Sequence, residues 1–460
     1  MDKVNQDKKK LITRRNFLVG IVIAIVIGLL SACAPKIIEK TTELPVTTLA
    51  AITPTLPTSA STTLTTSPTT TTTTKMTITG ISLPVPINTE ISVETVLNSR
   101  FSYSGVDALV SPADIQQLSN VLWAVGKAPM VGPTRKITIA TQAGTFGPGT
   151  GGTYSYNPDT HSLTKISGNL TDQGAFKISW DIGQNGLIFD AGLIYMPALL
   201  ASDSLWNTTE SLVSSPKQLD IVFGRQNGIE FNTQCVAHST VQQGQPGWLP
   251  DPSTTGSDKL GDVLANLNYT NKFNQANLTL QQISQLLWAG YGCTPHGDTK
   301  GITTPSAYDS LYLTGTIYLV NENGVFRYQN RQPTDNFFTH PEDPSNFFNT
   351  RDHRLEQISS SDVRDTLRSA VSGLSQAPCY IVLSLDRKYD DDATTTIKTY
   401  ANLETGFVAF NYLLQASAMG LGCNLKTQLT SNEQGSIQSI TKIPTADKPL
   451  VVVSLGGMGN

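Results

Sequence analysis

The chain has 460 residues, of which 39% are hydrophobic and 15% are charged, and its formal net charge is −4. This length accommodates two or three domains. The acidic balance argues against a nucleic-acid-binding surface, which would need clustered basic side chains. The five cysteines are too few for a disulfide framework in a chain of this length.

The first 33 residues have the pattern of a bacterial lipoprotein signal peptide. Five basic side chains within residues 8–15 precede an apolar run over residues 17–30, which is too short to span a bilayer comfortably. The run ends in Leu30-Ser31-Ala32-Cys33, which resembles a lipobox and predicts lipidation of Cys33. An uncleaved membrane anchor is the alternative, and both interpretations place the body of the protein outside the cytoplasm.

A second signal lies inside the basic region. Residues 13–18, Thr-Arg-Arg-Asn-Phe-Leu, resemble a twin-arginine signal. This export route carries folded proteins, so a cofactor could be inserted before export. Residues 34–80 are dominated by Thr, Pro and Ser. Such a composition buries too little apolar surface to fold, so we predict a disordered tether to the membrane.

The body of the chain contains one internal repeat. Residues 114–124 and 280–289 both place apolar residues at the spacing of an amphipathic helix. Thr279 is the expected N-cap of the second helix. For the first helix we expect Ser111 as N-cap and Pro112 as the first helical residue.

Two further motifs repeat in the same order. Residues 154–156, Tyr-Ser-Tyr, match residues 326–328, Phe-Arg-Tyr, and a segment beginning at His161 matches one beginning at His353. The period of about 165 residues is too long for a solenoid and predicts a duplicated domain. We place the two copies at residues 85–230 and 260–460.

Each half is expected to mix helices and strands. Apolar, β-branched segments predict five strands, at residues 137–140, 219–223, 316–320, 379–385 and 450–454. The strongly apolar residues 407–419 predict a buried helix, which Gly420 would cap. The expected fold class is therefore α+β.

The order of motifs in the second half resembles that of the nitroreductase family, in its SagB-type branch, which is similar to azoline dehydrogenases. Residues 283–292 (ISQLLWAGYG) are followed by Thr304-Pro305-Ser306-Ala307, and Glu404-Thr405-Gly406 precedes the apolar helix. The resemblance covers residues 260–460 and, more faintly, 90–230. It implies a dimer of α+β protomers with FMN between them, so the two halves would form a pseudo-dimer within one monomeric chain.

The resemblance also implies which residues would bind FMN. Cations near the start and end of a domain hold the phosphate, and the Pro-Ser-Ala segment of the opposite protomer lies against the ring. The Glu-x-Gly turn lies near the reactive edge of the ring. The implied FMN-binding residues are Arg100, Ser102, Arg225, Pro305, Ser306, Ala307, Glu404 and Gly406.

The two halves keep different parts of this set. The two arginines expected at the phosphate, Arg100 and Arg225, are in the first half. In place of the Pro-Ser-Ala segment, the first half has only residues 141–144. We therefore expect a single FMN site, with Arg100 and Arg225 from one half and Pro305 to Ala307 from the other. However, Glu404 lies in the half that lacks these two phosphate-binding arginines, and at the corresponding place the first half has only the looser residues 183–186.

The expected function is thus a membrane-anchored, extracytoplasmic FMN-dependent oxidoreductase. Its rival is a nitroreductase-fold lipoprotein that has lost its flavin and acts as a binding or scaffold protein. A third possibility is a surface lipoprotein that binds a peptide or a small ligand in the former active-site cleft of the fold. Nicotinamide cofactors are scarce outside the cytoplasm, so a quinone or a partner protein is considered as the redox partner.

Other chemically active residues are expected to have structural roles. Trp123 and Trp288 occupy core positions of amphipathic helices, and packing is also the expected role of His161 and His353. The remaining histidines lack the spacing of a metal site. The residue pair 388–389, Lys-Tyr, loosely resembles a proton-transfer pair, and no catalytic residue is assigned. Disulfides among Cys235, Cys293, Cys379 and Cys423 remain open, with buried thiols as the alternative at the last two.

Overall fold

The computed structural model describes most of the body of the chain. The described residues are 80–87, 90–99, 114–132, 135–172, 174–181, 187–206, 208–215, 218–225, 247–292, 294, 302–305, 307, 313–314, 316–330, 353–385 and 395–460. They all belong to one compact unit. Cys33, the rest of the predicted signal peptide and nearly all of the predicted tether lie outside them. Within the described ranges, no helix is long and apolar enough to cross a membrane.

The first half contains a seven-stranded sheet with strand order β1-β4-β3-β2-β5-β7-β6, in which every neighbouring pair is antiparallel. Its strands are β1 (Gly80–Ser82), β2 (Ile137–Thr141), β3 (Gly152–Asn157), β4 (Ser162–Ser167), β5 (Phe176–Asp181), β6 (Thr208–Ser215) and β7 (Gln218–Arg225). In β2 the buried residues alternate with half-buried ones. This alternation is typical of a sheet that packs on a core with one face only.

The second half contains a six-stranded antiparallel sheet with strand order β10-β9-β8-β11-β13-β12. Its strands are β8 (Thr316–Asn321), β9 (Gly324–Gln329), β10 (Arg354–Ser359), β11 (Cys379–Leu385), β12 (Leu421–Lys426) and β13 (Lys448–Gly457). Every residue of β8 and β11 is buried. Both faces of this sheet are therefore covered at its centre.

The two sheets correspond strand for strand. Apart from β1, the order β4-β3-β2-β5-β7-β6 repeats as β10-β9-β8-β11-β13-β12. The register repeats as well, since Ile139 pairs with Tyr154 and Leu319 pairs with Phe326. All five strands predicted from the sequence are present, within a few residues at their ends.

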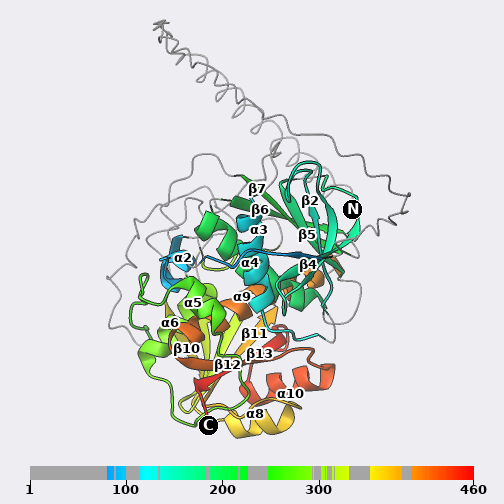
Figure 1. The fold of residues 1–460 in the computed structure, drawn as a ribbon. Helices are drawn as coiled ribbons and strands as arrows, with labels where there is room; N and C mark the ends of the chain where they lie inside the picture. The colour runs from blue at the N-terminus through cyan, green and yellow to red at the C-terminus, as the bar shows by residue number, and fades with distance from the viewer. Residues whose placement is uncertain are drawn as a thin grey trace, which may run out of the picture. The chain divides into compact units, whose positions relative to one another are not determined.

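The helices also occur in matching positions along the chain (Figure 1). The first half has α2 (Val93–Ser99), α3 (Ile115–Lys127) and α4 (Leu187–Trp206), and the second half has α5 (Leu260–Ala265), α6 (Leu280–Tyr291) and α9 (Thr395–Ala418). Thr279 caps α6 through a capping box, as predicted. The N-cap of α3 is Asp114, not Ser111, because the Asp114 carboxylate accepts the backbone N–H of Gln116.

The long helix α9 differs from the prediction at its start. It begins at Thr395, so Glu404-Thr405-Gly406 lies inside the helix rather than in a turn before it. The residues of α9 before Phe407 are largely polar, so the hydrophobic pattern of the sequence does not show that the helix begins before them. The end of the helix agrees, since Gly420 follows Ala418 with a φ of 68°.

Helices α4 and α9 pack against each other in the core that joins the two halves. They approach most closely at Gly192 and Gly406: a Cβ atom built on Gly406 would lie 2.8 Å from the Cα of Gly192. The rings of Tyr195 and Phe407 pack beside this crossing, with their centroids 4.7 Å apart. Two glycines face each other here because only glycine allows the backbones so close.

The start of α2 and the start of α5 contact each other reciprocally. The N–H of Val93 donates to the carbonyl of Asp258 at 3.1 Å, and the N–H of Leu260 donates to the carbonyl of Ile91 at 2.8 Å. Ser92 and Lys259 form the antiparallel bridge between these two bonds. Equivalent residues of the two halves thus meet across a local two-fold arrangement.

A serine, a histidine and a tyrosine form the same hydrogen-bonded set in each half. Nε2 of His161 lies 2.8 Å from Ser119 Oγ and its Nδ1 lies 2.9 Å from the Tyr156 hydroxyl. Nε2 and Nδ1 of His353 lie 2.7 and 2.9 Å from Ser284 Oγ and the Tyr328 hydroxyl. These contacts confirm the structural role expected for the two histidines.

Among the described residues, two more helices occur only in the second half. Helices α8 (Arg364–Ala370) and α10 (Ser431–Thr441) lie together on the face of the second sheet that points away from α9 (Figure 1). They bury a separate apolar cluster with Tyr318, Val320 and Val382. The matching face of the first sheet carries polar residues such as Thr138, Ser155 and Thr164, which need no such cover.

Candidate functional site

A buried carboxylate organises the region where α6, α9 and the segment after α6 meet. Glu404 of α9 is completely buried. Its Oε1 accepts the N–H of Thr314 at 2.8 Å and the hydroxyl of Tyr291 at 3.1 Å. Its Oε2 accepts the N–H of Ala307 at 3.4 Å. Glu404 therefore ties the Pro305–Ala307 segment and the approach to β8 to the central helix.

The segment before Pro305 is anchored just as firmly. The hydroxyl of Thr304 donates to the carbonyl of Gly290 at 2.7 Å, and the hydroxyl of Thr303 donates to that of Trp288 at 3.1 Å. From α9, the amide of Asn411 donates to the Thr303 carbonyl at 3.3 Å. Both threonines are fully buried. The Thr304 hydroxyl gives the Gly290 carbonyl at the end of α6 a partner, and the Thr303 hydroxyl adds a second donor to the Trp288 carbonyl, which already accepts the N–H of Gly292.

Burial dominates the electrostatics of Glu404. It raises the pKa of this carboxyl from 4.5 to about 7, although the backbone N–H groups and the Tyr291 hydroxyl partly offset the effect by favouring the charged form. Since the folded-state pKa lies above the unfolded one, the stabilising contribution of the protonated carboxyl is complete below about pH 4.5. It is lost as the pH rises to about 7.

The pH dependence of stability tests this carboxyl. Between pH 5 and pH 8 we expect the native chain to lose about 2–3 kcal/mol of unfolding free energy relative to Glu404→Gln, which cannot ionise. Urea unfolding across that range measures the difference. The control is Glu356→Gln, on the exposed edge of β10, which should follow the native profile. Parallel profiles for the native chain and Glu404→Gln would contradict the assignment.

Asp190 is the counterpart of Glu404 in the first half. Each residue stands two positions before the glycine at the α4–α9 crossing. The Asp190 carboxylate accepts two hydrogen bonds from Arg135, at 2.6 and 2.8 Å, and the N–H of Val131 at 3.5 Å. The Arg135 guanidinium also donates to the Ala128 and Pro129 carbonyls, at 2.7 Å each. The same post-helix segment is therefore tied to the central helix in both halves.

These contacts correct two expected counterparts in the first half. The segment matching Pro305–Ala307 is residues 129–131, Pro-Met-Val, and not residues 141–144, which end β2 and begin the following turn. The residue matching Glu404 is Asp190 inside α4, and not residues 183–186. The correct matches follow the contacts with the central helix, which a linear alignment of short polar motifs does not contain.

The structure brings only part of the expected FMN-binding set together. Pro305 and Ala307 lie beside Glu404. Gly406 faces Gly192 and Phe189, so its visible role is helix packing. Arg225 is the last residue of β7, and its side chain is not described. Arg100, Ser102 and Ser306 lie outside the described residues, as do residues 388–389.

The described residues fit the ring end of a flavin. Pro305 is half-buried, and Ala307 next to it is buried and held through its backbone by Glu404. A proline ring and an alanine methyl group are small apolar surfaces of the kind on which a planar ring can pack. The cations expected at the phosphate end are Arg100 and Arg225, whose side chains are not described. The described side chains therefore include residues expected at the flavin ring and none expected at the phosphate.

Other predicted features are resolved within the described ranges. Cys379 and Cys423 are free and buried, which confirms the buried-thiol alternative over a disulfide for these two residues. Cys235 and Cys293 lie outside these ranges. Trp288 is fully buried, whereas Trp123 is half-buried with the Lys127 ammonium 5.2 Å from its ring centroid. No group of three or more potential metal ligands occurs among the described side chains.

Sequence reasoning missed the residues that hold this site together. Tyr291, Thr314, Asp190 and Arg135 were not singled out, and neither was Gly192. The one usable signal was in α4, where residues 187–201 form a long apolar segment that contains one acidic residue, Asp190. An isolated charge within such a segment is buried, so it must be paired.

The second half matches a known family. Residues 270–457 match the model of the nitroreductase family. A protein of Methanocaldococcus jannaschii that bears the name of a nitroreductase is 29% identical over 211 residues, which cover 43% of this chain and 90% of that protein. The chain therefore contains a nitroreductase-family domain.

The fold has a solved counterpart that spans both halves. A crystal structure from Anabaena variabilis, also bearing the name of a nitroreductase, aligns with 82% of this chain and 94% of its own, with a TM-score of 0.51 and 14% identity. This likeness shows a nitroreductase-like fold. Its span is greater than either half of the chain alone.

Proposed function

From the nitroreductase-family domain in residues 270–457, we propose that this protein is an FMN-dependent oxidoreductase. The observation that carries the proposal is the anchoring of Thr304 by the end of α6 and of Ala307 by Glu404, on either side of the segment that the family resemblance expects against the flavin ring. When bound, FMN would supply the hydride or electron transfer. The chain would position the ring and shield it from water.

The proposal treats the two halves as a tandem duplication that forms a pseudo-dimer within one chain. Three observations support this: the strand-for-strand match of the sheets, the repeated Ser-His-Tyr set, and the reciprocal contacts between α2 and α5. The close crossing at Gly192 and Gly406 supplies the interface. Such a chain contains both partners of the dimer, so it would act as a monomer. The motif order of the second half supports the SagB-type branch.

The proposed flavin site is single and lies between the halves. Arg100, Ser102 and Arg225 of the first half would hold the phosphate, and Pro305, Ser306 and Ala307 of the second half would face the ring. The opposite arrangement has no arginine in residues 266–268, the stretch of the second half that corresponds to Arg100, and it has Met130 where Ser306 stands. That side would take no flavin. Glu404 would act as a positioning residue for the ring-facing segment.

The proposal also places the protein outside the cytoplasm, on the membrane. Its support is the lipobox that ends in Cys33 and the twin-arginine pattern at residues 13–18. A Thr-, Pro- and Ser-rich tether would hold the folded body away from the bilayer. Export of the folded protein would allow FMN to be inserted beforehand. A quinone or partner protein would then be the redox partner.

Flavin quantitation on the full-length chain tests the proposal. We expect detergent-purified protein to be yellow with about one FMN per chain, since only one side has both the phosphate and the ring residues. Arg100→Ala should lower flavin occupancy at least about tenfold, because it removes a charge-assisted phosphate contact. Arg368→Ala, on α8 of the second half, is the charge-matched control.

Each alternative has its own outcome in this measurement. Colourless protein that does not take up added FMN would favour the flavin-free binding or scaffold function. Two flavins per chain would contradict the single site and leave the oxidoreductase function standing. Equal flavin loss in Arg100→Ala and Arg368→Ala would show that Arg100 does not bind the phosphate.

A further inference from the structure

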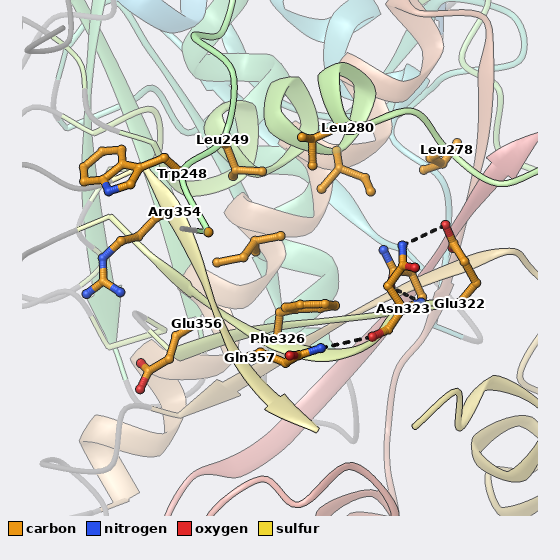
Figure 2. Close-up of a pocket in the computed structure, with 14 residues that line it drawn as sticks. Trp248, Leu249, Leu278, Leu280, Glu322, Asn323, Phe326, Arg354, Glu356 and Gln357 are labelled. Carbon is orange, nitrogen blue, oxygen red and sulfur yellow. Dashed lines mark hydrogen bonds between the residues drawn. The ribbon is translucent and has the colours of Figure 1, made fainter. Parts of the chain in front are cut away.

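A groove of about 660 Å³ opens on the second half, outside the proposed flavin site. It lies between β9 and β10 on one side and the segment 247–249 with the start of α6 on the other. In Figure 2 the ring of Phe326 lies across the groove from Leu249 and Leu280. Trp248 stands at one end, and the turn between β8 and β9 forms the other. The groove has the volume and the mixed apolar lining of a binding site.

The walls of the groove combine exposed apolar side chains with the charged residues Glu322, Arg354 and Glu356. Phe326 is only half-buried, and Leu280, the first residue of α6, is 52% exposed. Ile283, one turn further along α6, lines the same side. An exposed leucine and a half-buried phenylalanine that face the same concave surface, with polar groups around them, are typical of a binding groove.

The first half shows what occupies the equivalent place there. Tyr154 corresponds to Phe326, because each stands at the same register position between matching strands. The ring of Phe146 packs edge-on against Tyr154, with the centroids 5.1 Å apart and the planes at 75°. Lys165, which corresponds to Gln357, also contacts this ring, with its ammonium 5.9 Å from the Tyr154 centroid. Tyr154 is consequently only 2% exposed.

The difference arises from one connection. In the first half, residues 142–151 join β2 to β3 and carry Phe146 over Tyr154. In the second half, the equivalent connection is the tight turn at residues 322–323, closed by Gly324 with a φ of 123°. This turn is too short to place a side chain over Phe326. Its polar groups bond locally, since the Asn323 side chain donates to Glu322 at 3.1 Å.

We infer that the groove beside Phe326 docks a partner polypeptide that inserts one aromatic side chain, in the way that Phe146 packs on Tyr154 in the first half. A polypeptide suits the volume, because the internal counterpart is a ring together with the loop that carries it. The partner segment is uncharged, like residues 142–151, which contain no Asp, Glu, Lys or Arg. This binding is separate from flavin binding and does not depend on the proposed function.

A peptide copied from the protein itself is the probe. A fluorescein-labelled peptide with the sequence of residues 142–151, QAGTFGPGTG, is titrated with the full-length chain in detergent, and its anisotropy is followed. We expect saturable binding of one peptide per chain, with a Kd on the order of 0.1 mM. A peptide with alanine in place of the phenylalanine should bind at least about tenfold more weakly, since a buried aromatic anchor dominates such interfaces.

Two variants place the binding in the groove. Leu280→Trp fills the groove from its exposed rim and should weaken binding at least about tenfold. Gln281→Trp adds the same side chain at the next, exposed position, which does not line the groove, and should bind like the native chain. A third chain, in which residues 142–151 replace residues 322–323, should occupy its own groove and lose binding.

Several outcomes would overturn the inference. If binding did not saturate at millimolar concentrations of the protein, docking of this kind would be excluded. If the alanine peptide bound as tightly as the native peptide, the aromatic side chain would not be the anchor. Equal effects of Leu280→Trp and Gln281→Trp would place binding elsewhere. If N-acetylphenylalaninamide displaced the peptide at the same concentration as unlabelled peptide, the groove would be a site for small aromatic molecules and not for a polypeptide.

Discussion

Replacing Gly406 by valine should destabilise the protein more than any other single change considered, by about 4 kcal/mol or more. A Cβ atom on Gly406 would lie 2.5 Å from the carbonyl oxygen of Phe189 and 2.8 Å from the Cα of Gly192. Both obstacles are backbone atoms of α4, so no side chain can rotate away. The two central helices would have to separate, and the core between the halves would open.

A second glycine provides the matched control. Gly435 lies inside α10, and a Cβ atom there would meet nothing within 4 Å. Gly435→Ala should therefore stabilise the protein, by about 0.5–1 kcal/mol, because alanine is the better helix former. Urea unfolding followed by circular dichroism measures both variants. Native-like stability of Gly406→Val would mean that α4 and α9 do not cross at these glycines.

The Gly406→Val variant also bears on the flavin. The proposed site takes residues from both halves, so separating α4 from α9 should lower FMN occupancy as well as stability. Gly435→Ala should leave the flavin content unchanged. A variant that unfolds readily but keeps one FMN per chain would argue that the cofactor is held within one half.

Removing Arg135 should have the next largest effect. The Arg135–Asp190 ion pair is 2.6 Å long, and the two side chains are only 9% and 2% exposed. In Arg135→Met the Asp190 carboxylate would remain buried with the N–H of Val131 as its one other described donor. Breaking a buried pair in this way costs about 3–5 kcal/mol, because it leaves an uncompensated charge in the core.

Two comparisons isolate that mechanism. The Lys177–Asp172 pair is 2.9 Å long, but its acidic side chain is 72% exposed, so Lys177→Met should cost less than about 1 kcal/mol. In the double variant Arg135→Met/Asp190→Leu the buried charge is gone, and most of the lost stability should return. A double variant as unstable as Arg135→Met would instead assign the loss to the contacts of Arg135 with Ala128 and Pro129.

The sequence was sufficient where the local pattern and the final structure agree. The two amphipathic helices carrying Trp123 and Trp288 follow from the spacing of their apolar residues, and β11 was predicted to the residue. The duplication was proposed from three short motifs, and two of them turn out to contain the Tyr and His of the repeated Ser-His-Tyr set. These residues are readable because each half needs the same local contacts.

Local pattern failed where a polar residue is buried by the tertiary structure. Glu404 and Gly406 were read as a turn, although both lie within α9. A glycine disfavours a helix interior locally, and a carboxylate disfavours a buried position. The packing of α4 on α9 explains the glycine, and the hydrogen bonds from Tyr291, Ala307 and Thr314 explain the buried carboxylate. Likewise, the segment matching Pro305–Ala307 was sought by sequence likeness, whereas Asp190 identifies it as residues 129–131 through its contact with Val131.

The amino-acid sequence by itself was thus enough for the mixed class of helices and strands and for the nitroreductase-family domain, and it predicted a repeat and an address outside the cytoplasm. Only the tertiary structure decided which residues hold the site and which surface is left open. The pairing of Asp190 with Arg135, the burial that shifts Glu404 and the groove beside Phe326 all depend on segments far apart in the chain. Hydrophobic spacing records whether a residue is buried, but it does not record against what.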